Sequence, residues 1–196
     1  CAVNINEALY KKYDVNLFTV EDLYKPKTLR GVRIIAFPGG YGEAEKFDSI
    51  LKPYSEPILD FMDRRGRYLG ICMGAYWAGP KYFNLLRNLE PVQYIKRPRT
   101  EIHRSHGTTV EIDWMGTTQK MYFYDGCAIL GHGRKYTIAT YKNGDPMAII
   151  QDRVGLIGCH PESSRSWYEK PFIDPFWHRG HHHKLLLEFT NMLMEP

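Results

Sequence analysis

Residues 68–76 read Tyr68-Leu69-Gly70-Ile71-Cys72-Met73-Gly74-Ala75-Tyr76, and this stretch decides the fold of the chain. It holds the pattern G-x-C-x-G, with an apolar run typical of a β-strand before it and a helical pattern after it. With serine in place of cysteine, the same arrangement is the nucleophile elbow, a sharp strand-to-helix turn that exposes its central side chain. The two glycines are needed because Cβ atoms would clash across the turn. The following helix points its N-terminus at Cys72, which favours the thiolate over the thiol.

A second motif, Gly158-Cys159-His160-Pro161-Glu162, ends another apolar run. Pro161 disfavours helix at the residue before it, so His160 is expected in an extended conformation. Because residues two apart in an extended chain face the same side, Glu162 can bind one ring nitrogen of His160 while the other accepts the Cys72 proton. We therefore predict Cys72, His160 and Glu162 as nucleophile, base and orienting carboxylate. The alternative, a buried cysteine and an unrelated surface turn, does not explain why two specific motifs occur together.

A third apolar run, residues 31–37, leads into Pro38-Gly39-Gly40. Glycines let the backbone approach a reacting group closely and present its N–H groups. An amide of Gly39 or Gly40, together with the amide of Met73, would form an oxyanion hole beside the nucleophile. An ordinary turn between a strand and a helix is the alternative.

These motifs together resemble the class I glutamine amidotransferase-like superfamily and, within it, the family of the biotin-protein ligase N-terminal domain. The resemblance covers residues 31 to about 163 and rests on five segments: Phe37-Pro38-Gly39-Gly40, Gly70-Ile71-Cys72-Met73-Gly74-Ala75-Tyr76, Tyr122-Phe123-Tyr124-Asp125-Gly126, Tyr136-Thr137-Ile138-Ala139-Thr140-Tyr141 and Gly158-Cys159-His160-Pro161-Glu162. It implies a flavodoxin-like α/β fold, a small-molecule carboxamide or acyl substrate, and a partner enzyme that accepts ammonia.

One position departs from the superfamily pattern. Its glutaminases carry a glutamine four residues after the nucleophile, where this chain has Tyr76. Tyr76 argues against glutamine as the natural substrate, and we expect Tyr41, Tyr76, Tyr124, Asp125 and Gly126 to line the substrate pocket. We also expect a free-standing relative of the ligase accessory domain, because no ligase catalytic segment follows, so biotin transfer is not implied.

Three functions remain open at this point. The main hypothesis is a cysteine hydrolase or amidotransferase, and the rival is a binding or regulatory module that keeps the elbow without turnover. The third is a nucleic-acid-associated protein that uses the basic cluster Tyr94, Lys96, Arg97, Arg99 and Arg104. A solvated loop explains that cluster better than a nucleic-acid surface does.

The composition bounds these hypotheses. A chain of 196 residues with 43% hydrophobic residues can form one domain, residues 1–196, with its own core. It lacks an apolar run of about 18 residues, so no membrane span is expected. The four cysteines, at positions 1, 72, 127 and 159, do not suggest a disulfide framework and fit a reducing, cytoplasmic setting. No cofactor or metal is expected, and Cys1 at the start is interpreted as a trimmed beginning.

The pattern of strands and helices predicts a parallel sheet with helices on both faces. Helices are expected at residues 4–12, 54–65 (ended by Gly66) and 182–193, and strands at 15–20, 32–37, 67–71, 108–112, 120–124, 135–141 and 148–151. The last four strands would form an antiparallel insertion, about 91–151, packed on the main sheet. Gly40, Cys72 and His160 would lie at the carboxyl ends of strands, where such folds bind ligands.

Two further histidines and one cysteine complete these expectations. His178 and His182 would share a helix face and could suit zinc, but solvated histidines at a helix start explain them better. Cys159 is expected in the core, on the face of its strand opposite to His160.

Overall fold

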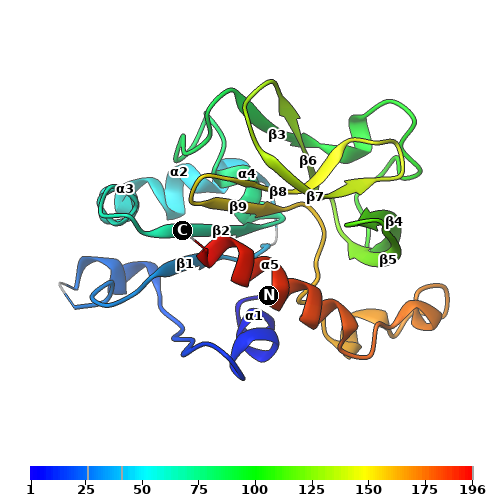
Figure 1. Cartoon of the computed structure of the whole chain (residues 1–196), viewed down its shortest axis with the longest axis horizontal. Coiled ribbons are helices and arrows are strands. Elements are labelled where there is room, and N and C mark those ends of the chain that lie inside the picture. Colours follow the sequence, from blue (N-terminus) through cyan, green and yellow to red (C-terminus); the bar gives the residue numbers. More distant parts are fainter. Residues whose placement is uncertain (26, 41, 196) are drawn as a thin grey trace.

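The computed structural model describes residues 1–25, 27–40 and 42–195. The strands are β1 (Ile34–Phe37), β2 (Arg67–Ile71), β3 (Leu89–Gln93), β4 (Thr108–Trp114), β5 (Thr117–Phe123), β6 (Cys127–Gly131), β7 (Tyr136–Tyr141), β8 (Pro146–Gln151) and β9 (Val154–Ile157). Seven of them form one sheet in the order β1-β2-β9-β8-β7-β4-β5, and β3 pairs with β6 in a second, smaller sheet (Figure 1). This is the mixed α/β fold that the sequence predicted.

Helices cover both faces of the main sheet. The α-helices are α1 (Ala2–Leu9), α2 (Phe47–Ile50), α3 (Ser55–Asp63), α4 (Met73–Trp77) and α5 (His181–Met194). Short 3-10 helices are η1 (Val20–Tyr24), η2 (Ala44–Lys46), η3 (Lys52–Tyr54), η4 (Tyr94–Lys96), η5 (Arg165–Tyr168) and η6 (Asp174–Phe176). In Figure 1, α1 and α5 lie together on one face of the sheet, and α2 and α4 lie on the other. None of the helices in the described ranges is both long enough and apolar enough to cross a lipid bilayer.

Alternation of side chains along β2 explains this layering. Leu69 is buried in the core that Phe189 of α5 shares, whereas its neighbour Tyr68 is buried in the second core with Ile58 of α3. Successive residues of a strand point to opposite faces, so a strand that is apolar throughout needs cover on both sides. Gly155 of β9 leaves the space that Phe189 fills, because a Cβ there would lie 2.7 Å from its ring. Each large apolar side chain buried in this way contributes about 1.5–3 kcal/mol.

The sheet changes direction halfway across. β1, β2 and β9 are parallel neighbours, and every pairing from β9 through β8, β7 and β4 to β5 is antiparallel. The predicted antiparallel strands are therefore present, but they continue the main sheet and do not pack on it. The part that lies over the sheet is the β3–β6 pair, which the sequence analysis missed. Pro91 in the middle of β3 argues against a strand, and an edge position in a two-stranded sheet tolerates it.

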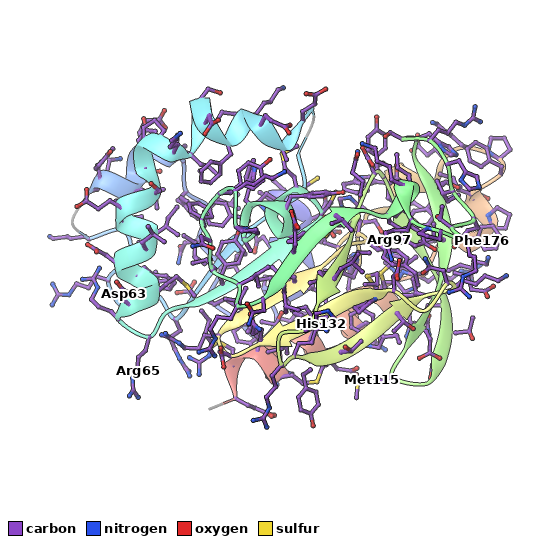
Figure 2. All side chains as sticks on the ribbon, turned by 90° about the horizontal axis from the view of Figure 1, so that it is seen from above. Asp63, Arg65, Arg97, Met115, His132 and Phe176 are labelled. Carbon is purple, nitrogen blue, oxygen red and sulfur yellow. The ribbon has the colours of Figure 1, made fainter. Side chains whose placement is uncertain are left out.

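Two local expectations were wrong. The strand expected at residues 15–20 is absent: residues 14–19 have no regular secondary structure, and Leu17 is 57% exposed. The residue that ends α3 in the left-handed region is Arg65 (φ 66°), not Gly66. Arg65 projects away from the molecule (Figure 2). Gly66 is needed for another reason, because a Cβ there would overlap the Phe61 ring.

Candidate active site

Three loops meet at one edge of the sheet because three parallel strands end there. Gly39 and Gly40 follow β1, Cys72 follows β2, and His160 comes soon after β9. β2 lies between the other two strands in the sheet order. The Cys72 amide donates to the Ile157 carbonyl at 2.8 Å, which ties the turn after β2 to the end of β9.

The turn at Cys72 has the strained geometry of a nucleophile elbow. Cys72 lies at φ 52° and ψ −106° and precedes the first residue of α4. A Cβ at Gly74 would overlap the Phe37 carbonyl oxygen, and a Cβ at Gly70 would overlap the Gly74 carbonyl. A cysteine held at positive φ costs roughly 1–3 kcal/mol, and such strain persists mostly at functional sites.

His160 and Glu162 form a buried hydrogen-bonded pair. His160 Nδ1 donates to Glu162 Oε1 at 2.9 Å, and the two residues are 4% and 0% exposed. Burial alone would lower the pKa of His160. The negative charges of Glu162 and Cys72 and the hydrogen bonds to both outweigh burial and raise the pKa to about 10. The imidazole is therefore held as imidazolium beside the Glu162 carboxylate.

Gly39 lies against both Cys72 and His160. A Cβ at Gly39 would lie 2.6 Å from His160 Cε1 and 3.3 Å from Cys72 Cβ. The glycine backbone thus occupies a space that both side chains border. Cys72 Sγ also lies 3.5 Å from the Tyr124 carbonyl oxygen, to which its thiol form can donate.

A cavity of about 810 Å³ opens in front of Cys72. It is lined by Gly40, Gly42, Glu43, Ala44, Glu45, Cys72, Met73, Tyr76, Gly79, Pro80, Lys81, Tyr82, Glu90, Pro91, Val92, Gln93, Lys96, Arg97, Ser105, Tyr124, Asp125 and Leu130. The lining thus includes Gly40 and Met73 of the predicted oxyanion hole and three of the five predicted pocket residues, Tyr76, Tyr124 and Asp125.

The remaining two predicted pocket residues are not among the cavity-lining residues that the structure describes. Gly126 is not among the lining residues, and a Cβ there would overlap the Gly158 carbonyl oxygen, so it serves the close approach between the turn before β6 and the segment just after β9. Tyr41 lies outside the described residues.

Gln93 is a pocket residue that sequence reasoning missed. Its amide nitrogen lies 3.1 Å and 3.3 Å from the two carboxylate oxygens of Asp125. The Tyr76 hydroxyl donates to the Asp125 carbonyl at 3.3 Å, and Asp125 itself adopts a positive φ of 51°. Gln93 belongs to β3, which crosses over the sheet, so no local pattern placed it beside Asp125.

Aromatic rings and histidines hold the loop that carries His160 and Glu162. The rings of Tyr122 and Trp167 lie 6.0 Å and 5.3 Å from the His160 ring, both edge-on. His178 and His183 both lie within hydrogen-bond distance of the Ser163 carbonyl, at 2.9 Å and 3.1 Å.

His178, His182 and His183 are therefore structural, and the expectation that His178 and His182 are solvated was wrong, whereas His181 at the start of α5 is exposed. His182 is 3% exposed, and burial lowers its pKa to about 3. Burial likewise lowers the pKa of His178 to about 4, despite its bond to Ser163. His178 precedes α5, which begins at His181, so the helical spacing assumed for a zinc pair does not apply. Its Nδ1 instead accepts the amide of Gly180 at 3.1 Å.

The basic cluster at 94–104 does not form one exposed patch. Tyr94 is fully buried and stacks on Tyr141 with ring centroids 3.6 Å apart. Arg97 donates to Asp145 at 2.7 Å, and both Arg97 and Lys96 line the cavity. The cluster thus contributes to the pocket wall.

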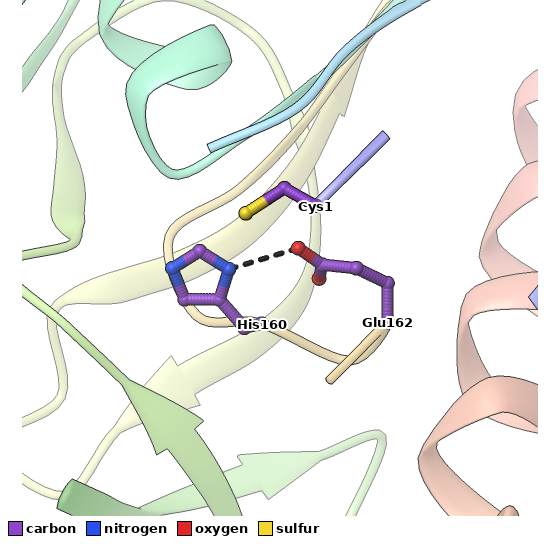
Figure 3. Close-up of side chains that lie close together, drawn as sticks. All are labelled: Cys1, His160 and Glu162. Carbon is purple, nitrogen blue, oxygen red and sulfur yellow. Dashed lines mark hydrogen bonds and ion pairs between the residues drawn. The ribbon is translucent and has the colours of Figure 1, made fainter. Parts of the chain in front are cut away.

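Within the described ranges, one group of three side chains could hold a metal ion. Cys1, His160 and Glu162 place their ligand atoms within 4.8 Å of one another (Figure 3). The other three cysteines are also free, and Cys127 and Cys159 are fully buried. Burial raises the pKa of both of these thiols well above the ordinary value, so they are core residues.

Comparison with known proteins agrees with this description. Residues 1–86 match the family described as biotin-protein ligase, N terminal. No curated protein matches the chain. A structure titled as a glutamine amidotransferase superposes with a TM-score of 0.67 at 15% identity, covering 97% of this chain and 93% of the other.

Two further structures show the same fold. A glutamine amidotransferase from Methylobacillus flagellatus has a TM-score of 0.61 at 12% identity, covering 97% of this chain and 86% of its own. PurLQS from Thermotoga maritima has a TM-score of 0.63 at 13% identity, covering 97% and 92%. By fold, the chain is a glutamine amidotransferase-like α/β protein. Its first 86 residues match the biotin-protein ligase N-terminal family, which confirms the resemblance that the motifs indicated.

Proposed function

We propose that this protein is a cysteine-dependent hydrolase or amidotransferase that acts on a carboxamide or related acyl substrate. One observation carries the proposal: strained Cys72 and the His160–Glu162 pair border the same glycine at the end of parallel strands. Core cysteines have no need of a strained backbone or of a buried imidazolium nearby. A nucleophile is activated by a neighbouring base, and backbone strain of this kind clusters at active sites.

The reaction proceeds in two halves. The Cys72 thiolate attacks the substrate carbonyl carbon, and the carbonyl electron pair moves to oxygen, where amides of Gly39 or Gly40 and Met73 stabilise it. The oxyanion then collapses, the C–N bond breaks, and His160 gives its proton to the departing nitrogen. Water next attacks the thioester as His160 takes up its proton, which releases the acid and restores Cys72. Throughout, Glu162 acts as the positioning residue for His160.

The pocket supports a polar substrate of modest size. Asp125 offers a carboxylate that Gln93 orients, and Lys96 and Arg97 bring positive charge to the same cavity. Such a lining suits a substrate that carries both an amino and an acidic group. Tyr76 takes the place of the glutamine found in glutaminases, so the substrate group at this position differs from that of glutamine.

Amidotransferases pass the nitrogen that they release to an acceptor. The fold shared with glutamine amidotransferases supports a partner enzyme that accepts ammonia from this chain. In the absence of that partner, we expect the isolated protein to release the ammonia into solution.

Covalent trapping tests the proposed activity. The protein is incubated at neutral pH with a panel of carboxamide-like electrophiles, including chloroketone analogues of amino-acid amides, and intact-protein mass spectrometry detects adducts. We expect one adduct per chain on Cys72, none in Cys72→Ser, and formation slowed about 100-fold or more in His160→Ala.

Cys127→Ala is the matched control, because Cys127 is a buried thiol outside the site. Cys127→Ala should form the Cys72 adduct at the same rate as the wild-type protein. An adduct that forms equally fast in His160→Ala would show that Cys72 reacts as an ordinary thiol and would contradict the proposal.

A second candidate function is a binding or regulatory module that keeps the elbow without turnover. Tyr76 favours it, because at the position where glutaminases carry a substrate-holding glutamine its hydroxyl is committed to the Asp125 carbonyl. Such a module would bind amides from the panel, shown by a raised melting temperature, without ammonia release or a covalent adduct.

A further inference from the structure

A second thiol, that of Cys1, lies beside His160 and Glu162 of the candidate triad. Cys1 Sγ is on the same side of the His160 ring as the hydrogen bond to Glu162 (Figure 3), and the ligand atoms of the three residues lie within 4.8 Å of one another. The position of Cys1 is set by α1, which it precedes and whose Ile5 and Leu9 are buried in the core shared with α5.

Glu162 has an unsatisfied oxygen at this place. Its Oε1 accepts from His160, but Oε2 is buried without a hydrogen-bond partner, and the residue is 0% exposed. A buried carboxylate oxygen left without a partner is costly, and a nearby cation would satisfy it. This observation is independent of the position of the Cys1 thiol and also points to a ligand.

We propose that Cys1, His160 and Glu162 form a Zn²⁺ site that blocks the catalytic base. Thiolate, imidazole and carboxylate are the ligand types that zinc takes in proteins, and three protein ligands leave a fourth position for water. One thiolate and one carboxylate together neutralise the divalent charge. Ligand atoms around tetrahedral zinc lie about 3.3–3.6 Å apart, so the exposed Cys1 side chain closes the site by a small rotation.

The consequence for the chemistry rests on the proposed function. Zinc binds the ring nitrogen that otherwise donates to Glu162, and the proton of that nitrogen is released to solvent. The remaining proton of the neutral ring then resides on Nε2. His160 can no longer take up a proton there, and Cys72 loses its base. Free zinc would therefore inhibit the protein reversibly.

Cobalt titration of the folded full chain tests the site without any assay of activity. Co²⁺ replaces Zn²⁺ in tetrahedral sites, and a thiolate ligand gives an intense charge-transfer absorption. We expect one Co²⁺ per chain, displaced by Zn²⁺. Cys1→Ala and Glu162→Gln should each weaken binding about 100-fold or more, since even changes one shell further out cost about 10- to 100-fold.

Cys72→Ser is the decisive control. It should keep the thiolate absorption and the affinity, because Cys72 is not a ligand in this proposal. Absorption lost in Cys72→Ser but kept in Cys1→Ala would place the metal between Cys72 and His160 and overturn the site. Failure of the folded wild-type protein to bind Co²⁺ or Zn²⁺ would overturn it as well.

The proposed block of His160 by zinc is measured separately, through the rate at which Cys72 is alkylated. Zn²⁺ should slow alkylation of Cys72 in the wild-type protein but not, at the same concentration, in Cys1→Ala. Metal binding that leaves alkylation unchanged would overturn the proposed block. An inert Cys72 without zinc would contradict the proposed function, and the cobalt titration would still decide the metal site.

Discussion

The parallel and antiparallel halves of the main sheet contribute different parts of the candidate site. In the parallel half, β1, β2 and β9 run in the same direction, so the loops after them meet at one edge and bring Cys72 and His160 together. In the antiparallel half, hairpins such as the one at Asn143-Gly144 return the chain at once, and successive loops lie at opposite edges. Parallel strands thus gather the residues of the candidate site from distant segments. The antiparallel half supplies a wall of the pocket through Tyr124 and Asp125, just after β5.

The largest change in the free energy of unfolding should come from a glycine substitution in the parallel half, compared with one in the antiparallel half. Gly74→Ala in the parallel half places a Cβ against the Phe37 carbonyl oxygen, so the elbow must move; we expect a loss of about 3 kcal/mol or more. Gly144→Ala in the β7–β8 turn meets open space and bears only the strain of its φ of 89°, about 1–2 kcal/mol. Urea unfolding measures both. Equal losses of unfolding free energy in Gly74→Ala and Gly144→Ala would show that the two halves do not differ in how tightly their turns are packed.

Glu162→Gln tests whether the Glu162 carboxylate raises the pKa of His160. It keeps the shape of Glu162 but removes its charge, so the His160 pKa should fall from about 10 toward the ordinary value of 6.5. The histidine signal in NMR, followed against pH, reports this change directly. Adduct formation at Cys72 should fall about 100-fold. A His160 pKa unchanged in Glu162→Gln would mean that Glu162 does not sustain the imidazolium.

The C-terminal histidines should make the protein sensitive to acid. His182 and His178 titrate at about 3 and about 4 when folded, against an ordinary pKa of 6.5, because burial disfavours their charged forms. The unfolded chain therefore binds more protons below pH 6.5, and stability falls as the pH drops from there toward 4. Melting temperatures measured between pH 7 and pH 4 should show this decline.

His182→Phe is the variant that isolates the cause. Phenylalanine keeps an aromatic ring in the buried position but cannot bind a proton, so the acid decline should become shallower. A decline that is as steep in His182→Phe as in the wild type would assign the acid sensitivity to other groups.

The smallest effect is expected at the ion pair of the antiparallel half. Arg97 and Asp145 side chains are 30% and 16% exposed, and solvent screens their attraction. Arg97→Gln should cost about 0.2–1 kcal/mol, the usual range for such pairs. The free energy of unfolding at low and at high salt measures it. A loss above 2 kcal/mol would show that the pair is structurally essential.

The sequence was a good guide where function depends on local geometry. G-x-C-x-G predicted the strained turn at Cys72, and Pro161 between His160 and Glu162 predicted that these two residues would pair. Both patterns involve residues a few positions apart, and short-range sterics decide their conformations. The same patterns led to the glutamine amidotransferase-like fold.

The sequence was a poor guide where contacts join distant segments. A trimmed start was the favoured interpretation of Cys1, yet its thiol lies beside His160 and Glu162. Gln93 was not identified, although its amide nitrogen bonds to the Asp125 carboxylate. It belongs to β3, and Pro91 in the middle of that segment argued against a strand. His178 and His182 were expected in solvent, yet His178 binds the Ser163 carbonyl and His182 is buried.

By itself, the sequence determined the parallel core of the fold, the strained turn at Cys72, and the His160–Glu162 pair, because each follows from backbone sterics within one short segment. Only the tertiary structure decided that the antiparallel strands extend the main sheet, which residues line the cavity, and that Cys1 reaches the candidate triad. These depend on how separate segments pack against one another. Packing is decided by shape and burial summed over the whole chain, which no single motif contains.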